Sequence, residues 1–126
     1  MSGVTYDTGA LIAAERSSRE MWALHRRTLE RGIRPTVPTV VLGQAWRGGP
    51  QAQMSRLLRG CRIEPLTETQ ARSAGTALAA IGDTDLVDAA VVVFALARGD
   101  LVVTSDPGDV SRFAAGLGRS VAVHVV

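Results

Sequence analysis

The sequence predicts an α/β protein in which helices cover both faces of a parallel sheet. Short apolar segments alternate with longer segments that carry helix-capping and helix-stopping residues. Strands that alternate with helices favour a parallel sheet, because each helix carries the chain back across one face of it. The 126 residues, 46% of them hydrophobic, are enough for one core. No repeat or linker marks a second domain, so we expect one domain over residues 1–126.

Five short segments are the predicted strands, because each is brief and mostly apolar and is bounded by turn or helix signals. They are residues 4–6, 36–37, 62–64, 101–104 and 120–126. The first and fourth strands run into aspartates, at Asp7 and Asp106. The second leads through Pro38 into a helix.

Seven segments between and after these strands are predicted to be helical: residues 9–15, 18–31, 39–47, 51–59, 67–81, 84–98 and 107–115. Ser18 and Thr67 can cap the second and fifth helices with their side-chain oxygens. Gly32 and Gly99 are suited to end the second and sixth. The run Gly48-Gly49-Pro50 separates the third helix from the fourth.

Composition excludes several classes of function. All 14 basic residues are arginine, so chemistry that needs a lysine is absent, including P-loop phosphate binding and Schiff-base catalysis. A receiver-type phospho-acceptor switch is excluded for the same reason. The segment Thr8-Gly9-Ala10 begins no dinucleotide-binding glycine pattern. The net charge of +2 is too small to make the whole protein a polyanion binder, although a local basic patch is possible.

The sequence is typical of a cytoplasmic protein. A single cysteine, Cys61, cannot form an internal disulfide. We see no export signal, and the longest apolar run is interrupted by Asp88 and is too short to span a bilayer. His25 lies in a charged segment and is expected at the surface, and His124 is expected to be a packed or edge residue. Neither histidine has zinc-ligand spacing.

Acidic residues gather where strands end. Asp7 follows the first strand and Asp106 the fourth, and ligands of parallel sheets bind at the carboxyl ends of the strands. If these two strands are neighbours, about 4.8 Å apart, their carboxylates converge. Asp85 and Asp88 share one face near the start of the sixth helix, and Asp109 follows Asp106 by three residues.

Each acid also has a structural explanation. Asp7 and Asp106 could cap the helices that follow them, and Asp85 could complement a helix dipole. Asp88 is harder to explain in this way, because it lies inside an otherwise apolar segment, where an unpaired charge is expensive. Together the acids predict a site for Mg²⁺ or Mn²⁺, which take oxygen ligands. Such a site suits the attack of water on a phosphoryl group.

The sequence resembles the PIN-domain family, in particular its VapC-type toxin ribonucleases. The resemblance rests on Tyr6-Asp7-Thr8-Gly9-Ala10-Leu11, on Asp88-Ala-Ala-Val-Val92 and on Val103-Thr-Ser-Asp106 followed by Asp109. It implies a three-layer α/β/α sandwich with a central parallel sheet. It further implies an Mg²⁺- or Mn²⁺-dependent endoribonuclease, usually a homodimer, that a cognate antitoxin holds inactive.

Gln44 stands where the family usually has a glutamate. An amide oxygen can bind a metal but brings no negative charge. The resemblance therefore assigns Asp7, Asp88 and Asp106 as catalytic and metal-binding residues, with Asp109, Asp85 and Gln44 as further ligands. The alternative is a PIN-fold module that binds RNA or an antitoxin and is catalytically weak or silent.

Two surfaces are predicted for partners. Arg47, Arg56 and Arg59 could guide RNA toward the metal, because arginine pairs with phosphates, or could form an ordinary solvated face. The resemblance implies that an antitoxin segment packs between helices near the site. Trp22 or Trp46 is predicted to line that groove, a prediction that fails if both are fully buried.

Overall fold

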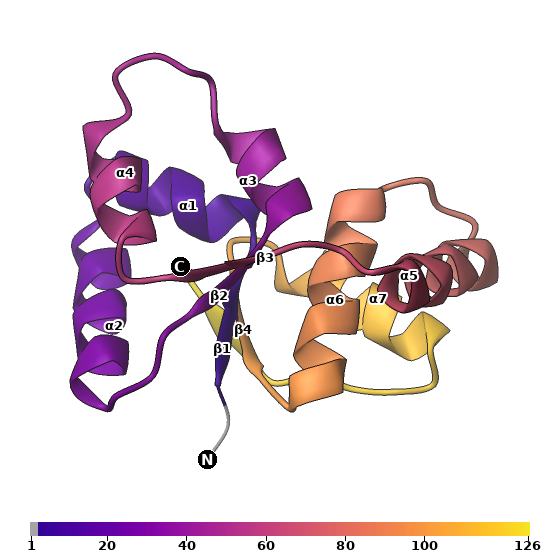
Figure 1. Cartoon of the computed structure of the whole chain (residues 1–126). Helices are drawn as coiled ribbons and strands as arrows, with labels where there is room; N and C mark the ends of the chain where they lie inside the picture. The colour runs from indigo at the N-terminus through magenta and orange to yellow at the C-terminus, as the bar shows by residue number, and fades with distance from the viewer. Residues whose placement is uncertain (1–2) are drawn as a thin grey trace.

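The structure, a computed structural model, describes residues 3–126, and within them the chain forms five strands and seven helices (Figure 1). The strands are β1 (Val4–Tyr6), β2 (Thr36–Pro38), β3 (Arg62–Glu64), β4 (Leu101–Thr104) and β5 (Val123–Val125). The helices are α1 (Thr8–Glu15), α2 (Arg19–Glu30), α3 (Thr39–Ala45), α4 (Ala52–Leu58), α5 (Glu68–Ile81), α6 (Leu86–Arg98) and α7 (Pro107–Gly116).

All five strands form one parallel sheet in the order β3-β2-β1-β4-β5. Helices cover both of its faces. In Figure 1, α1, α2 and α4 lie on one side of the strands, and α5, α6 and α7 lie on the other. Successive strands from β1 to β3 are added toward one edge of the sheet, and β4 and β5 are added toward the other edge. Because each crossover is right-handed, this change of direction puts the later helices on the opposite face. The predicted three-layer α/β/α fold class is confirmed.

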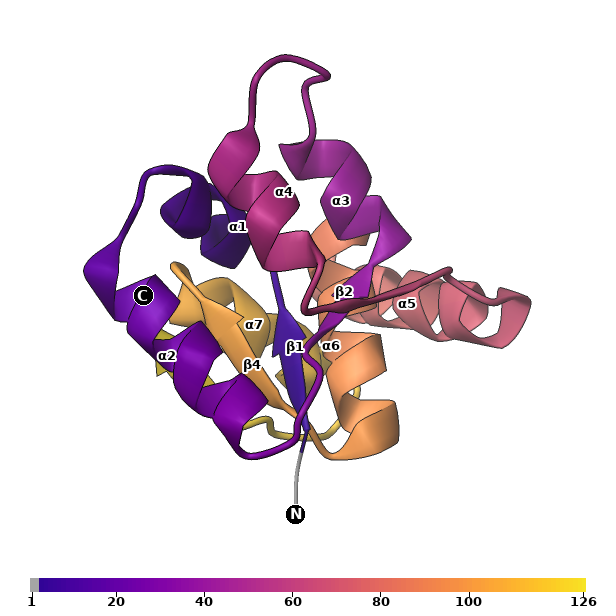
Figure 2. The same cartoon turned by 60° about the vertical axis from the view of Figure 1, so that its left-hand side comes forward.

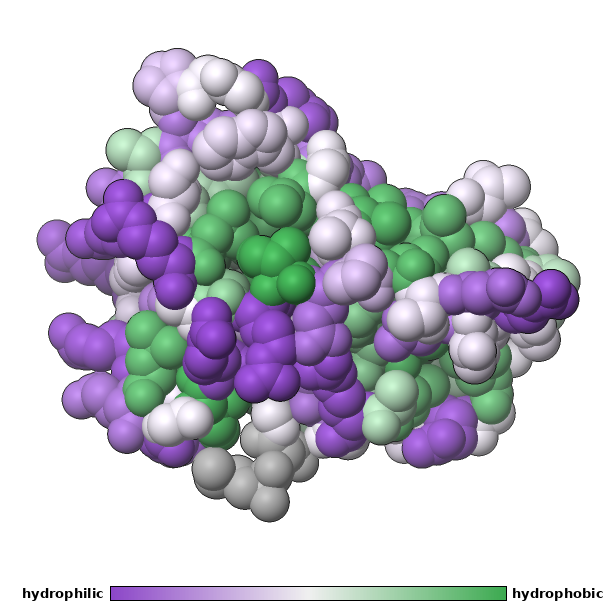
Figure 3. Space-filling model, viewed as in Figure 1, coloured by the Kyte–Doolittle hydropathy of each residue, from purple (hydrophilic) through white to green (hydrophobic). Residues whose placement is uncertain are grey.

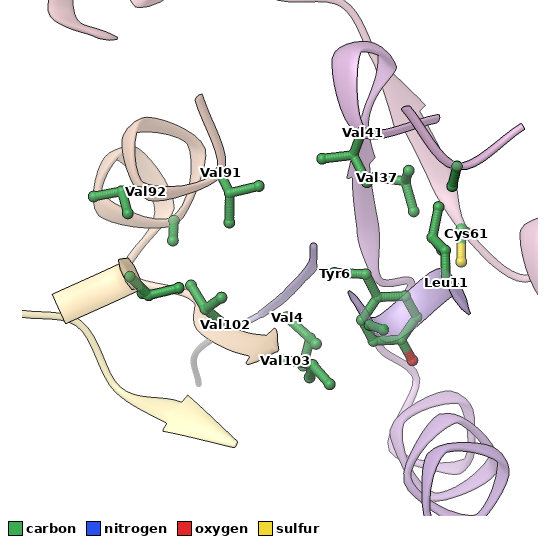
Figure 4. Packing of buried hydrophobic residues seen from close by; sticks show 14 of the residues in the cluster. Val4, Tyr6, Leu11, Val37, Val41, Cys61, Val91, Val92, Val102 and Val103 are labelled. Carbon is green, nitrogen blue, oxygen red and sulfur yellow. The ribbon is translucent and has the colours of Figure 1, made fainter. Parts of the chain in front are cut away.

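The central strands are buried on both faces, as expected for a parallel sheet covered by helices. Every residue of β1 is buried, and so are the last three residues of β4. Figure 4 shows Val91 and Val92 of α6 on one side of these strands and Leu11 and Cys61 on the other. The edge strands β3 and β5 are largely exposed or half-buried. The core therefore centres on β1 and β4, whose carboxyl ends carry the predicted acids.

The predicted element boundaries differ from the observed ones mainly at the ends. The last strand covers Val123–Val125 rather than residues 120–126. The sixth helix begins at Leu86 rather than residue 84, because Asp85 is its capping residue. The third helix ends at Ala45, after which Trp46 has an extended backbone. Ser18 and Thr67 cap their helices as predicted, and Gly99 ends α6 in the left-handed conformation.

The expected surface position of His25 is wrong. Its side chain is buried on the sheet-facing side of α2, and its Nδ1 lies 2.8 Å from the Tyr6 hydroxyl. Burial lowers the pKa of His25, with the Arg56 charge adding to the effect, and burial also raises the pKa of Tyr6. The charged neighbours of His25 in the sequence point outward, while His25 itself follows the buried stripe of the helix.

None of the helices within residues 3–126 has the length and apolar character needed to cross a membrane.

Candidate functional site

The two strands that end in aspartates are neighbours. β1 pairs with β4 in the register Tyr6 to Val103, and the Asp7 amide donates to the Val103 carbonyl at 3.1 Å. The strands lie side by side in Figure 2. Because both run in the same direction, Asp7 and Asp106 lie at the same edge of the sheet. Asp7 is only 8% exposed, whereas Asp106 is exposed.

The three aspartates that follow a strand or turn all cap helices, which was predicted for Asp7 and Asp106, whereas Asp85 was expected only to complement a helix dipole. Asp7 Oδ1 accepts from the Ala10 amide at 2.9 Å at the start of α1. Asp106 Oδ1 accepts from the Asp109 amide at 3.2 Å at the start of α7. Asp85 Oδ1 accepts from the Asp88 amide at 3.1 Å at the start of α6. Capping and clustering are therefore compatible, since each cap fixes a carboxylate at a helix start.

Gly9 allows the start of α1 to approach the loop between β4 and α7. A Cβ atom at this position would lie 2.1 Å from Ser105 Oγ and 3.1 Å from the Ser105 backbone nitrogen. Any other residue would therefore push the two segments apart. The small residue after Asp7-Thr8 is needed to keep Asp7 close to the chain that carries Asp106.

Thr104 links the Asp7 carboxylate to the backbone of Asp106, and its role was not predicted from the sequence. Its buried side chain donates a hydrogen bond to the Asp7 carboxylate, and its Oγ1 accepts from the Asp106 amide at 2.9 Å. The sequence feature that could have indicated this role is the place of Thr104 in Val103-Thr-Ser-Asp106, directly before the loop. A polar side chain at the buried end of an apolar strand calls for such partners.

The acids are close enough to repel one another. The pKa of Asp88 is raised to about 7, chiefly by burial and in addition by the charges of Asp85, Asp109 and Asp7. The pKa of Asp7 is also raised, chiefly by burial and to a lesser extent by Asp106, while hydrogen bonds from Thr104 and backbone amides oppose this shift. The edge therefore concentrates negative charge that a bound cation would neutralise.

Gln44 lies on α3, beside α1, the helix that follows Asp7. Its Oε1 accepts a hydrogen bond from Thr8 Oγ1 at 2.5 Å, which joins α3 to the first turn of α1. Gln44 is exposed, as a residue at the rim of a site would be. The Gln44 side chain is thus held next to Thr8, the residue that follows Asp7, and its carbonyl oxygen already accepts a hydrogen bond from the Thr8 hydroxyl.

Arg112 is a cation at this edge that the sequence reasoning missed. Its Nη1 lies 2.9 Å from Asp83 Oδ2 and its Nη2 lies 3.0 Å from Asp109 Oδ1. Arg112 lies three residues after Asp109, one turn along the same helix. The three-residue spacing within a predicted helix was the available signal.

The three predicted RNA-binding arginines are exposed but have different surroundings. The Arg47 guanidinium donates to the Trp46 carbonyl at 2.8 Å. The Arg56 guanidinium lies 4.1 Å from the centre of the Trp22 ring, within a groove of about 920 Å³ between α2 and α4. Arg59 follows at the end of α4. Arg56 therefore belongs to the groove that contains Trp22 and His25.

Neither tryptophan is fully buried. Trp22 is half-buried and lines the groove with Arg56, and Trp46 is 39% exposed beside a smaller groove between α3 and α4. Figure 3 shows apolar surface over α3 and β3, where Ile63 is also exposed. Full burial of both tryptophans would have excluded a partner groove lined by either one. Because neither is fully buried, that prediction still stands.

The donor set fits a hard divalent cation, because aspartate and amide oxygens are the ligands that Mg²⁺ and Mn²⁺ prefer. Mutual repulsion among Asp7, Asp85, Asp88 and Asp109 is a cost that such a cation would remove. Across residues 3–126, however, no three His, Cys, Asp or Glu side chains are already arranged to hold a metal ion. Binding would therefore require carboxylate side chains to turn toward the ion.

Solved structures share this fold at low sequence identity, whereas no model of a known protein family and no curated protein matches the chain. A chain of VapBC2 from Rickettsia felis, solved bound to a DNA fragment from the promoter, has a TM-score of 0.72, 13% identity and 98% coverage of both chains. A chain of DNA-bound VapBC from Salmonella typhimurium has a TM-score of 0.72 and 14% identity, over 99% of this chain and 98% of that one. PAE2754 from Pyrobaculum aerophilum has a TM-score of 0.64 and 16% identity, over 97% and 83%. These matches support a VapC/PIN-type fold.

Proposed function

We propose that this protein is a metal-dependent endoribonuclease that acts as the toxin of a toxin–antitoxin pair. The observation that carries the proposal is the position of Asp7 at the carboxyl edge of β1 and β4, where it experiences the charge of Asp106 and its own charge acts on Asp88. The likeness of the fold to VapBC chains supports it. Mutual repulsion that is retained in a folded protein marks a functional site better than a structural one.

Asp7, Asp88 and Asp106 would hold Mg²⁺ or Mn²⁺, with Asp85, Asp109 and Gln44 as further oxygen donors. The bound ion would lower the pKa of a water molecule and neutralise charge on the scissile phosphate. Asp7 contributes a fixed carboxylate, because the Ala10 amide and the Thr104 hydroxyl hold it in place. Asp88 keeps its proton up to about pH 7 when no metal is bound.

Metal binding should therefore depend on pH. Because an ion displaces the Asp88 proton, the affinity for Mn²⁺ is expected to rise as the pH increases toward 7 and to level off above it. Titration of the protein with Mn²⁺ between about pH 6 and about pH 8, one unit on either side of that pKa, would measure this. An affinity that does not change across this range would contradict the assignment of Asp88.

The proposed partners are RNA, a cognate antitoxin and a second copy of this chain. Arg47 and Arg59 are exposed and available to phosphates. The groove between α2 and α4 combines the faces of Trp22 and Arg56 with the exposed Leu29, which suits an antitoxin segment with apolar and acidic side chains. The homodimer follows from the resemblance to VapC-type toxins.

Cleavage of a mixed RNA pool by the purified, antitoxin-free protein tests the activity. The protein is titrated with Mg²⁺ and with Mn²⁺, and EDTA and the Asp7→Asn variant serve as controls. Asparagine is a matched control, because it keeps the cap of α1 and removes only the charge. Cutting that depends on metal and is lost in both controls supports the nuclease. A folded protein that cuts with neither metal contradicts it.

A second candidate function is a catalytically silent module that binds RNA or an antitoxin. The observation that favours it is the hydrogen bond between Gln44 Oε1 and Thr8, which leaves the site one charge short and one oxygen engaged. The Gln44→Glu variant separates the two functions. A silent wild type with an active Gln44→Glu variant indicates the binding module, whereas an active wild type shows that Gln44 is tolerated.

A further inference from the structure

Arg112 connects two segments that carry different acids of the site. It lies on α7, and its guanidinium binds Asp109 on the same helix and Asp83 in the turn before α6. Two separate nitrogens make these contacts, at 3.0 and 2.9 Å. The planar fork of arginine can bind two carboxylates at once, which the single ammonium of lysine does less well.

The contact continues from Asp83 to Asp88 through backbone hydrogen bonds. Asp83 Oδ1 accepts from the amides of Thr84 and Asp85, at 2.6 and 3.0 Å. Asp85 Oδ1 then accepts from the Asp88 amide. Arg112 therefore holds one oxygen of Asp83, while the other oxygen shapes the turn from which α6 starts. This chain of contacts ties the start of α6 to the start of α7.

These contacts are too exposed to be explained as a large contribution to stability. The side chain of Arg112 is 47% exposed, and that of Asp109 is 38% exposed. Ion pairs in such positions contribute little to folding, because water screens them. They nevertheless lie between two groups of acids that repel one another, where small displacements would change how many carboxylates can reach one ion.

We propose that Arg112 is a positioning residue that clamps the turn containing Asp83 to α7, and so sets the spacing between the acids of α6 and those of α7. This inference rests on the proposed metal site for its functional consequence. Asp85 and Asp88 belong to one side of the clamp, and Asp106 and Asp109 belong to the other. Without the clamp, like charges on the two helix starts would move apart.

A role for Arg112 as a nearby charge and a role as a clamp predict opposite changes in Mn²⁺ affinity when Arg112 is removed. If Arg112 acts only as a nearby positive charge, its loss makes the edge more negative and tightens Mn²⁺ binding. If it is a clamp, its loss weakens Mn²⁺ binding although a repelling cation has gone. We expect Arg112→Met to weaken Mn²⁺ binding roughly tenfold, as is typical when a residue that supports metal ligands is lost.

Three further variants sharpen the test. Arg112→Lys keeps the charge but not the fork, so it should recover only part of the affinity. Asp83→Asn keeps an oxygen for the turn but loses the ion pair, so it should weaken Mn²⁺ binding in the same direction as Arg112→Met. Arg72→Met is the matched control, because Arg72 also forms an exposed ion pair, with Glu68 on α5, and should leave Mn²⁺ affinity unchanged.

Mn²⁺ affinity of each variant is measured by calorimetry, and amide hydrogen exchange is measured without metal. The clamp predicts faster exchange at Asp85, Asp88 and Ala89 in Arg112→Met, with no change at Ala10 and Leu11 in α1. Unchanged exchange at these three amides overturns the clamp, and so does Mn²⁺ binding that is equal to or tighter than that of the wild type. If the wild type binds neither Mn²⁺ nor Mg²⁺, the proposed nuclease fails, and the exchange result alone decides the clamp.

Discussion

The pair of central strands has a buried aspartate at each end, and the two aspartates have different surroundings. Asp100, before β4, is 7% exposed, and Asp7, after β1, is 8% exposed. Asp100 accepts a hydrogen bond from the buried Thr5 hydroxyl at 2.8 Å, which ties β1 to the start of β4. Asp7 also accepts hydrogen bonds, but it lies among Asp88 and Asp106.

Burial by itself therefore does not distinguish a structural acid from a functional one. The two side chains are equally hidden, and each is hydrogen-bonded. What differs is the charge nearby: the pKa values of Asp7 and Asp88 are raised chiefly by burial and further by neighbouring carboxylates. A protein selected for stability alone would avoid such a group, so its presence indicates a function.

The largest expected difference between the two ends is in RNA cleavage. Asp7→Asn should reduce metal-dependent cleavage by more than about 100-fold, because it removes a proposed metal ligand. Asp100→Ala should leave the cleavage rate of the folded protein within about threefold, because Asp100 lies at the opposite end of β4. Rates are compared at one temperature, well below the unfolding of either variant. Equal losses in the two variants would remove the distinction.

The stability effects should have the opposite order. Asp100→Ala should lower the free energy of unfolding by about 1–3 kcal/mol, because it leaves the buried Thr5 hydroxyl without its partner. Asp7→Asn should leave stability unchanged or raise it, since it relieves repulsion and keeps the helix cap. Denaturant unfolding measures both values. Thr5→Ser, which retains a hydroxyl, is the control for Asp100 and should be milder than Asp100→Ala.

The clustered acids at the carboxyl ends of β1 and β4 should lower the free energy of unfolding by an amount that depends on pH, because Asp88 titrates near neutrality. Its pKa is raised to about 7, so the folded state retains a proton that the unfolded state releases near pH 4. The contribution of Asp88 to wild-type stability should therefore fall as pH rises from 4 to 7. Asp88→Asn should be more stable than the wild type by about 1–2 kcal/mol at pH 8, a value reduced for solvent exposure. Thermal unfolding should show no such advantage at pH 4.

The smallest expected effect concerns the hydroxyl that supports Asp7. Thr104→Val keeps the shape of the side chain but loses the hydrogen bond to Asp7 and the acceptor for the Asp106 amide. We expect a loss of about 1 kcal/mol in unfolding free energy. The pKa of Asp7 should rise further, so the acid limb of the cleavage profile should move to higher pH. An unchanged profile would show that Thr104 does not tune Asp7.

Local signals made most of the secondary structure predictable. Ser18, Thr67 and Gly99 act where the sequence places them, because capping and left-handed backbone depend on a few neighbouring residues. Contacts between distant segments were harder to predict. His25 is buried against Tyr6, and Thr104 bonds to Asp7, and neither partner lies nearby in the sequence.

The sequence by itself determined the α/β class, the order of strands and helices, and which acids follow strands, because these depend on short-range patterns of apolar, capping and turn residues. Only the tertiary structure decided which acids meet. β1 and β4 are separated by 94 residues between Tyr6 and Leu101 along the chain, yet they pair in the sheet. That pairing places Asp7 beside Asp106, and packing of α6 against α7 places Asp83 within reach of Arg112. These contacts depend on how buried surfaces fit together in three dimensions, which no local pattern specifies.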